Sequence, residues 1–303
     1  MSKGRISSAS RKTRQTTLKA SQSPVGRVIR FLGVSLGGGK TDKACVVVLE
    51  FYPEHKKIFL SRVFEKIKSE GAISGDLKIH EIYELYRGEF ESICFDVPLS
   101  LPLCLSCNLK CPGFEACEED HIKWFWKQDH QESKKKRPRK LFTPYTQRAV
   151  EWHLMNQLEE KFEVSHAMGS NSAPLLARAR FIARRFKSPC IEVQPKVSVW
   201  RIGSSLGVMK SHIKYHRHSV GGDLSRREIL AALNDKNFAF VYDQDVKLMI
   251  ENNHAFEAFI CAVTGFLKYR GLTVKKPAGF PSQEAWVEYP VENIPWSQVL
   301  NFR

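Results

Sequence analysis

The stretch GVSLGGGKTDKA at residues 33–44 decides how the chain begins to fold, because it separates apolar runs at 30–36 and 44–51. A phosphate-binding loop needs a glycine five residues before Gly39, where this chain has Val34, and it must open into a helix. The β-branched run that follows the glycines is instead typical of a strand. Two strands joined by a glycine-rich turn form a hairpin, so the sequence predicts a hairpin rather than a nucleotide-binding loop.

The elements after this hairpin indicate the fold class. A near-alternating segment at 57–65 predicts a third antiparallel strand, and residues 76–87 predict a helix with Asp76 as its N-cap. A buried strand follows at 92–96. The order of three strands, a helix and a fourth strand that returns beside the first is that of the α/β ribonuclease-H-like fold. We therefore expect a mixed sheet flanked by helices.

The rest of the chain predicts an insertion and further helices and strands. Residues 1–30 are expected to form a disordered basic arm, and residues 31–303 one ribonuclease-H-like domain. A cysteine-rich and basic insertion interrupts that domain at about 99–140. The later elements follow from apolar periodicity: helices at 144–163, 173–187, 225–233 and 245–269, and strands at 190–199 and 238–242.

Charge points to a polyanionic partner. The net charge is +15, and three basic regions contribute to it. Residues 1–30 carry eight Lys or Arg and no acid, and 134–140 has six basic residues in seven. Between 164 and 222 the only acid is Glu192, among ten Lys and Arg. Any one run is compatible with a solvated surface, but three together favour nucleic acid.

Two absences in the sequence bear on location. No apolar run approaches the roughly 18 residues of a membrane span, so no membrane partner is expected. The N-terminus lacks the apolar centre of a secretory signal and has too few apolar residues for an amphipathic transit helix. We therefore expect a cytoplasmic protein in a reducing compartment.

Four of the eight cysteines are clustered, with the spacing Cys104-x2-Cys107-x3-Cys111-x5-Cys117. Four thiolates in a short loop suit one tetrahedral zinc ion, and a site closed by four protein ligands is structural. An iron–sulfur cluster is an alternative, because soft thiolates suit it and one cysteine precedes a proline. A third alternative is that these cysteines bind no metal or form disulfides.

Three acids occupy positions that suit metal-dependent phosphoryl chemistry. Asp96 ends a buried strand, Glu192 lies within a later strand, and Glu257 lies on the last helix, one turn after His254. Each acid could also have a purely structural role. Asp96 could cap a turn, Glu192 could point outward from an edge strand, and Glu257 could lie on a solvated helix face. Carboxylates that converge from strand ends and a helix are what a pair of Mg²⁺ or Mn²⁺ ions requires.

The order of several motifs resembles domain-of-unknown-function family 429, a group of predicted nucleases with a ribonuclease-H-like fold. The resemblance spans about residues 31–290. It implies a nuclease-like site that contains Asp96, Glu192 and the final-helix acid, here Glu257 where many relatives have Asp. The motifs that carry it are GVSLGGGKTD, FDVPLSLP at 95–102, the cysteines with CPG, TPYTQRAVE at 143–151, LLARARFIARR at 175–185, IEVQPK at 191–196 and HAFEAFICAVTG at 254–265.

One position departs from the nuclease pattern. Ribonuclease-H-like nucleases place an Asp in the middle of the first strand, and this chain has Ser35 there. A hydroxyl binds a divalent ion far more weakly than a carboxylate does. Asp42, further round the turn, is a candidate replacement. Otherwise the metal site is altered or catalysis has been lost.

Three functions from different classes follow. The first is a nuclease, a metal-dependent hydrolase of DNA or RNA, in which Asp96, Glu192 and Glu257 bind Mg²⁺ or Mn²⁺ and His254 steers water or the leaving group. Basic helices at 144–163 and 173–187 would contact phosphates. The second is a catalytically impaired nucleic-acid-binding protein of the same fold. The third is an electron-transfer or sensor protein with an iron–sulfur cluster.

Overall fold

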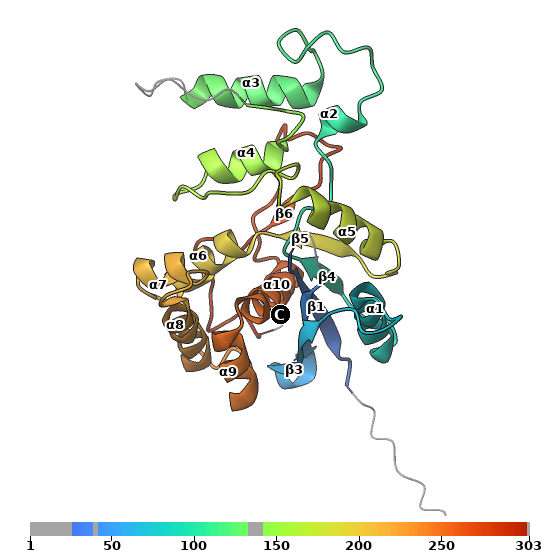
Figure 1. Cartoon of the computed structure of the whole chain (residues 1–303). Coiled ribbons are helices and arrows are strands. Elements are labelled where there is room, and N and C mark those ends of the chain that lie inside the picture. Colours follow the sequence, from blue (N-terminus) through green and yellow to red (C-terminus); the bar gives the residue numbers. More distant parts are fainter. Residues whose placement is uncertain (1–25, 39–41, 133–141, 302–303) are drawn as a thin grey trace, which may run out of the picture.

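The structure is a computed structural model that describes residues 26–38, 42–132 and 142–301. In this part of the chain, six strands form one mixed sheet in the order β3-β2-β1-β4-β5-β6 (Figure 1). The neighbours β1–β2 and β2–β3 are antiparallel, whereas β1–β4, β4–β5 and β5–β6 are parallel. The predicted meander and the return of the fourth strand beside the first are confirmed. The strands are β1 Ile29–Leu36, β2 Ala44–Tyr52, β3 Lys57–Ile67, β4 Ser92–Phe95, β5 Cys190–Val193 and β6 Val287–Glu288.

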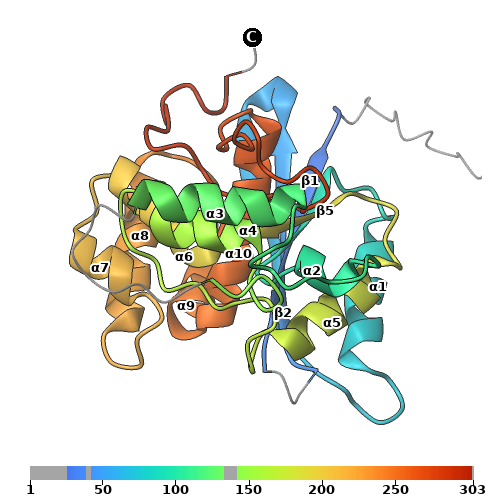
Figure 2. The ribbon, with the colours of Figure 1, turned by 90° about the horizontal axis from the view of Figure 1, so that it is seen from above.

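Helices cover both faces of the sheet, which explains why β1 and β2 are apolar on both sides. On one face Phe31 packs in a cluster with residues of α6 and α8–α10, and on the other Leu32 and Val34 pack against α1 and α5. Figure 2 shows these two groups of helices on opposite sides of the sheet. The helices are α1 Gly75–Leu85, α2 Leu103–Ser106, α3 Asp120–Glu132, α4 Ala149–Asn156, α5 Ala173–Ala183, α6 Pro195–Ser205, α7 Lys210–Tyr215, α8 Gly222–Asp235, α9 Asp243–Glu251 and α10 Asn253–Tyr269.

Two glycines set the close approach of α10 to the sheet. A Cβ atom at Gly33 in β1 would lie 1.8 Å from the carbonyl oxygen of Ala258 in α10. A Cβ atom at Gly265 in α10 would lie 2.4 Å from the sulfur of Cys94 in β4. Neither position tolerates a side chain, so β1, β4 and α10 meet with almost no gap. This packing fixes the first turn of α10 beside the ends of both strands.

The chain between β4 and α4 forms a separate layer. Aromatic residues of α3 pack with α4 and with residues 280–289 in their own hydrophobic cluster, which lies beyond the edge of the sheet in Figure 1. The basic run at 134–140, most of the predicted arm and the glycine-rich turn at 39–41 lie outside the described residues. Residues 29 and 30, assigned to the arm from the sequence, belong to β1. No helix within the described ranges has the length and apolar character of a membrane span.

Four predicted elements were wrong in extent. The strand expected at 190–199 ends at Val193, because Pro195 suits the first turn of a helix and begins α6. The helix expected at 245–269 is two helices, divided at Asn252, whose side chain caps α10. In 238–242 only Phe240 forms a β-bridge, with Phe59. The helix expected at 144–163 covers only 149–156.

Candidate functional site

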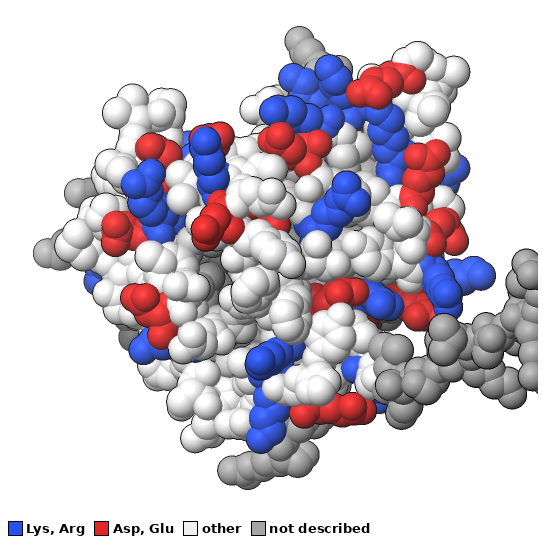
Figure 3. All heavy atoms as spheres, turned by 90° about the horizontal axis from the view of Figure 1, so that it is seen from below, with Lys and Arg blue, Asp and Glu red and all other residues white. Residues whose placement is uncertain are grey.

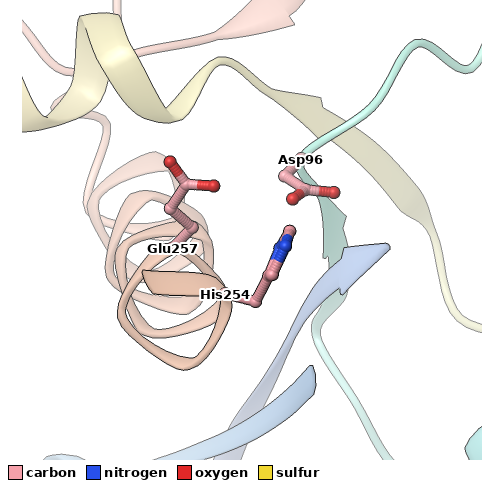
Figure 4. Close-up of side chains that lie close together, drawn as sticks. All are labelled: Asp96, His254 and Glu257. Atoms are coloured by element: carbon pink, nitrogen blue, oxygen red, sulfur yellow. The ribbon is translucent and has the colours of Figure 1, made fainter. Parts of the chain in front are cut away.

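The ends of β1 and β4 and the start of α10 meet at one edge of the sheet. Because β1 and β4 are parallel with Val34 opposite Phe95, Ser35 and Asp96 come to the same edge. The side chain of Asn252 accepts hydrogen bonds from the backbone N–H groups of His254 and Ala255, which begins α10 at this point. His254 and Glu257 therefore face Asp96, as Figure 4 shows.

Asp96, His254 and Glu257 form a compact group. One ligand atom from each, a carboxylate oxygen or a ring nitrogen, lies within 4.8 Å of the others. Among the residues that the structure describes, no other three His, Cys, Asp or Glu side chains converge in this way. The donor set of two carboxylates and one imidazole is chemically suited to a divalent cation.

Ser35 links two members of this group. Its hydroxyl donates to Oδ2 of Asp96 at 2.5 Å and lies 2.9 Å from Nδ1 of His254, and the N–H of Leu36 donates to Oδ1 of Asp96 at 3.0 Å. When the hydroxyl proton points to Asp96, the hydroxyl oxygen is free to accept a hydrogen bond from the Nδ1–H group of His254. Ser35 thus orients a carboxylate and an imidazole instead of supplying a third charge.

The two carboxylates of the group differ in their proton affinity. Burial, together with the negative charge of Glu257, raises the pKa of Asp96 to about 7, although hydrogen bonds from Ser35 and Leu36 oppose this. Burial alone would also raise the pKa of Glu257, but the charge of Arg217 and the contact with His216 outweigh it and lower that pKa to about 2. Near neutral pH, Glu257 is therefore ionised, whereas Asp96 is present in both its protonated and its ionised form.

Arg217 forms an ion pair with Glu257, and His216 lies beside this pair. Nε of Arg217 donates to Oε1 of Glu257, and Nε2 of His216 lies 3.4 Å from the same oxygen. Glu257 is 2% exposed, so the alternative of a solvated helix face was wrong. The side chain of Arg217 is 39% exposed, so part of it is in contact with solvent.

Glu192 is held by an arginine instead of joining the group. Both of its oxygens accept hydrogen bonds from the guanidinium of Arg148, at 2.6 and 2.7 Å, and Oε2 also accepts from the N–H of Leu99 at 2.9 Å. Glu192 is buried in β5, which β6 covers, so the alternative of an outward residue on an edge strand was wrong. The structure assembles Ser35, Asp96, His254 and Glu257, and it places Glu192 in the wall beside them.

Arg148, a basic residue of the segment 144–163 that was expected to contact phosphates, is instead buried in the core. It is 1% exposed and also donates from Nε to Glu151 at 2.7 Å. Glu284 accepts from the backbone N–H groups of Ala149 and Val150 at the start of α4. The opposite charges and backbone groups of this network satisfy one another in the core.

A cavity of about 370 Å³ brings these charges together. Its wall includes Asp96, Glu192 and Glu257 together with the cations Arg148, Arg217 and Lys196. Burial and the nearby charge of Arg217 lower the pKa of Lys196. Arg217 and Lys196 were not among the site residues predicted from the sequence. The only available signal was their position in the acid-poor segment 164–222.

Asp42 does not replace the missing first-strand acid. Its carboxylate accepts from the side chain and N–H of Ser69 and from the N–H of Gly75, at the start of α1. The hydrogen bond from Ser69 is the largest influence, and these contacts lower the pKa of Asp42 to about 2. Asp42 is a cap for the neighbouring backbone and does not line the cavity.

The four clustered cysteines line a different cavity, of about 290 Å³, beside α2 and α3. Sγ of Cys104 lies 3.5 Å from Nε2 of His121, a potential donor that the cysteine spacing did not suggest. Burial, with the nearby thiols, raises the pKa of Cys104 to about 11. All four are free thiols, and they do not converge as closely as the group at Asp96. Zinc binding here stays a prediction.

The chain matches no protein-family model, no curated protein and no solved structure.

Proposed function

We propose that this protein is a metal-dependent nuclease, a hydrolase of phosphodiester bonds in nucleic acid, with a ribonuclease-H-like active site. The observation that carries the proposal is the convergence of Asp96, His254 and Glu257 to within 4.8 Å in a cavity that also contains Arg217 and Lys196. Ligands for a cation and positive charges for a phosphate are the two things that phosphodiester hydrolysis requires of a protein.

The sheet supports this reading of the fold. The order β3-β2-β1-β4-β5, with β2 antiparallel to its neighbours and β1, β4 and β5 parallel, is the order expected of a ribonuclease-H-like domain. In that fold the acids lie at the first strand, the fourth strand and the last helix. Here these positions hold Ser35, Asp96 and Glu257.

The donor chemistry favours Mn²⁺ over Mg²⁺. Mg²⁺ prefers oxygen ligands alone, whereas Mn²⁺ accepts both carboxylate and imidazole ligands. With Ser35 in place of an Asp and Glu192 bonded to Arg148, the described residues support one ion instead of the two expected from the sequence. A bound Mn²⁺ would supply Lewis acidity at a phosphate oxygen and lower the pKa of a water molecule.

The residues around the group have distinct roles in this proposal. Ser35 holds Asp96 and His254 in place, and Asp96, with a pKa of about 7, gives up its proton when a cation binds. Arg217 moves from Glu257 to a phosphate oxygen of the substrate, which leaves Glu257 free to bind the cation. Lys196 lies on the same wall and adds a second positive charge.

The positive charges inside the cavity are candidate phosphate contacts, because at least one outer surface carries both positive and negative side chains and is not uniformly basic. On the face shown in Figure 3, Lys and Arg side chains are interspersed with Asp and Glu. Arg180 on α5 is exposed, and so are Arg184 and Arg185 directly after the helix, whereas Arg178 on α5 is paired with Asp76. We therefore expect nucleic acid to contact exposed residues of α5 and the cavity instead of the buried Arg148.

A second function, nucleic-acid binding without hydrolysis, is favoured by one observation. Two of the three predicted ligands, Glu192 and Glu257, are already bonded to arginines. If Arg217 does not leave Glu257, the group has too little negative charge to bind a cation. The fold would then serve binding alone.

One experiment separates the two functions. Purified protein is incubated with labelled single-stranded and double-stranded DNA, RNA and hybrid, with Mn²⁺, Mg²⁺ or chelator. The nuclease proposal predicts cleavage that requires Mn²⁺ and is lost in Asp96→Asn, while Asp235→Asn, on the exposed end of α8, keeps it. Binding to nucleic acid with no cleavage under any of these conditions would establish the second function.

A further inference from the structure

A second cavity lies directly beside the candidate site. It has a volume of about 460 Å³ and shares His254 with the first cavity. We call it the lysine pocket, after Lys43, Lys66 and Lys68 in its wall, where Gly37 and Asn252 also lie. Cavities of roughly 300–1,000 Å³ are large enough for a small ligand or one unit of a polymer.

The floor of the lysine pocket is uncharged. Ala44 and Cys45 of β2 form part of it and are 3% and 4% exposed. Sγ of Cys45 lies 3.5 Å from the side-chain nitrogen of Asn252, and burial raises the pKa of this thiol, which keeps it neutral. A flat, apolar group therefore meets no unsatisfied charge on this surface.

The rim, by contrast, is cationic. Lys43, Lys66 and Lys68 are exposed. Lys66 contacts Glu65 at 3.0 Å, and the acid on the rim, Glu70, contacts Lys78 at 2.9 Å. Within the described ranges, neither Lys43 nor Lys68 forms an ion pair. An apolar floor with a cationic rim is complementary to a ligand that has an apolar face and a negatively charged backbone.

We propose that the lysine pocket receives one unpaired nucleotide next to the scissile phosphate, and that the substrate is therefore single-stranded nucleic acid. This inference rests on the proposed nuclease function. The base lies on the floor of Ala44 and Cys45, and Lys43 and Lys68 contact its phosphate. Because the two cavities share His254, adjacent parts of one nucleic-acid strand can occupy them.

Strand preference follows from the cost of exposing a base. A base in a duplex enters a pocket only after it is unpaired and unstacked, which costs a few kcal/mol, whereas a single strand pays little of this. Apart from His254, none of the described residues that line the pocket is aromatic. Contact with an apolar floor discriminates poorly between bases, so little sequence preference is expected.

The first test measures binding in chelator, where no cleavage takes place. Lys43→Ala/Lys68→Ala should weaken binding of a labelled single-stranded oligonucleotide. It should also reduce the slope of log affinity against log salt by about 0.7, for the one phosphate that the two lysines contact. The matched control, Lys57→Ala/Lys236→Ala, removes two exposed lysines that lie outside both cavities and should change neither.

The second test blocks the pocket. A Cβ atom at Gly37 would lie 3.5 Å from Nε2 of His254 and 3.6 Å from Cβ of Lys43, both ordinary contacts, and the backbone there is not left-handed. Gly37→Ala is therefore tolerated, whereas the larger side chain of Gly37→Leu extends into the pocket. Gly37→Leu should lose oligonucleotide cleavage, and its control Gly37→Ala should keep it.

The outcomes separate this inference from the proposed function. If wild-type protein cleaves nucleic acid but the lysine and Gly37→Leu variants behave like their controls, the lysine pocket is not a nucleotide subsite and the nuclease proposal stands. If nothing is cleaved but the lysine variant still weakens single-strand binding, the nuclease proposal fails and the subsite stands. Equal affinity for duplex, or for a free mononucleotide, would overturn the subsite.

Discussion

Replacing Glu192 by Ala tests whether this acid is a metal ligand, as its position in the sequence suggests, or a structural partner of Arg148. The substitution removes two charge-assisted hydrogen bonds, at 2.6 and 2.7 Å, from a guanidinium that is 1% exposed. At about 1.5–3 kcal/mol for each hydrogen bond to a charged group, the loss is about 3–6 kcal/mol. Breaking a buried ion pair typically costs about 3–5 kcal/mol, which agrees.

Urea unfolding measures this loss. With a slope of about 3 kcal/mol per molar urea, a loss of about 3–5 kcal/mol lowers the midpoint by about 1–1.7 M. Glu192→Gln keeps one acceptor oxygen and should lose about half as much. The matched control is Glu163→Ala, because Glu163 lines the same cavity but is exposed. Its midpoint should stay within about 0.2 M of wild type, since exposed substitutions rarely exceed 0.5 kcal/mol.

The same variants decide the role of Glu192 in cation binding. Mn²⁺ affinity, measured by calorimetry well below the unfolding transition, should change little in Glu192→Gln, because Asp96, His254 and Glu257 supply the ligands. The structural role is refuted if Glu192→Ala unfolds within about 1 kcal/mol of wild type while Mn²⁺ binding is lost. Glu192 would then be a metal ligand, and its ion pair with Arg148 would not stabilise the fold.

Four further predictions concern the site and the two basic or cysteine-rich regions. Ser35→Asp should tighten Mn²⁺ binding, measured by calorimetry, because it restores a carboxylate beside Asp96; weaker binding would contradict the proposed site. The folded pKa of Asp96, about 7, exceeds its ordinary 3.8, so the native state binds this proton more tightly. Unfolding free energy should therefore fall as pH rises between those values, and Asp96→Asn should lose that dependence in urea titrations. Elemental analysis should find about one zinc per chain. Cys107→Ser or Cys111→Ser should lose this zinc while the packing of α10 stays intact. Finding neither zinc nor iron would exclude a metal at the cysteine cluster. Deleting residues 1–25 should flatten the salt dependence of nucleic-acid affinity, and an unchanged slope would mean that they do not contact phosphate.

The elements that the sequence predicted well are those with local signals. The alternation in 57–65 and the apolar runs around the glycine-rich turn produce β1 to β3 because their periodicity is a property of neighbouring residues. The errors arose where one residue overrides its neighbours. Val197 and Val199 favour a strand, but Pro195 starts a helix whose apolar face is buried. Asn252 supplies the cap that divides 245–269, a signal that was present in the sequence.

Four site residues named from the sequence, Ser35, Asp96, His254 and Glu257, do come together. This succeeded because a parallel sheet brings strand ends to one edge, and because Gly33 and Gly265 allow α10 to lie against it. The glycines gave no such signal in the sequence, since each one packs against a residue more than 150 positions away, Gly33 against Ala258 and Gly265 against Cys94. Asp42 shows the opposite case, in which a nearby position in sequence does not bring a side chain to the site.

An acid in an apolar segment looks the same in a sequence whether it binds a cation or an arginine, and the partner decides which. Arg148 is 44 residues from Glu192, and Arg217 is 40 residues from Glu257. The two pairs differ in one physical respect: the side chain of Arg148 is 1% exposed, whereas that of Arg217 is 39% exposed. Moving Arg148 would leave a charge uncompensated in the core, whereas in the proposed function the more exposed Arg217 turns toward an arriving phosphate. Of the two glutamates, Glu257 is therefore the one that we propose exchanges its arginine for a cation when substrate binds.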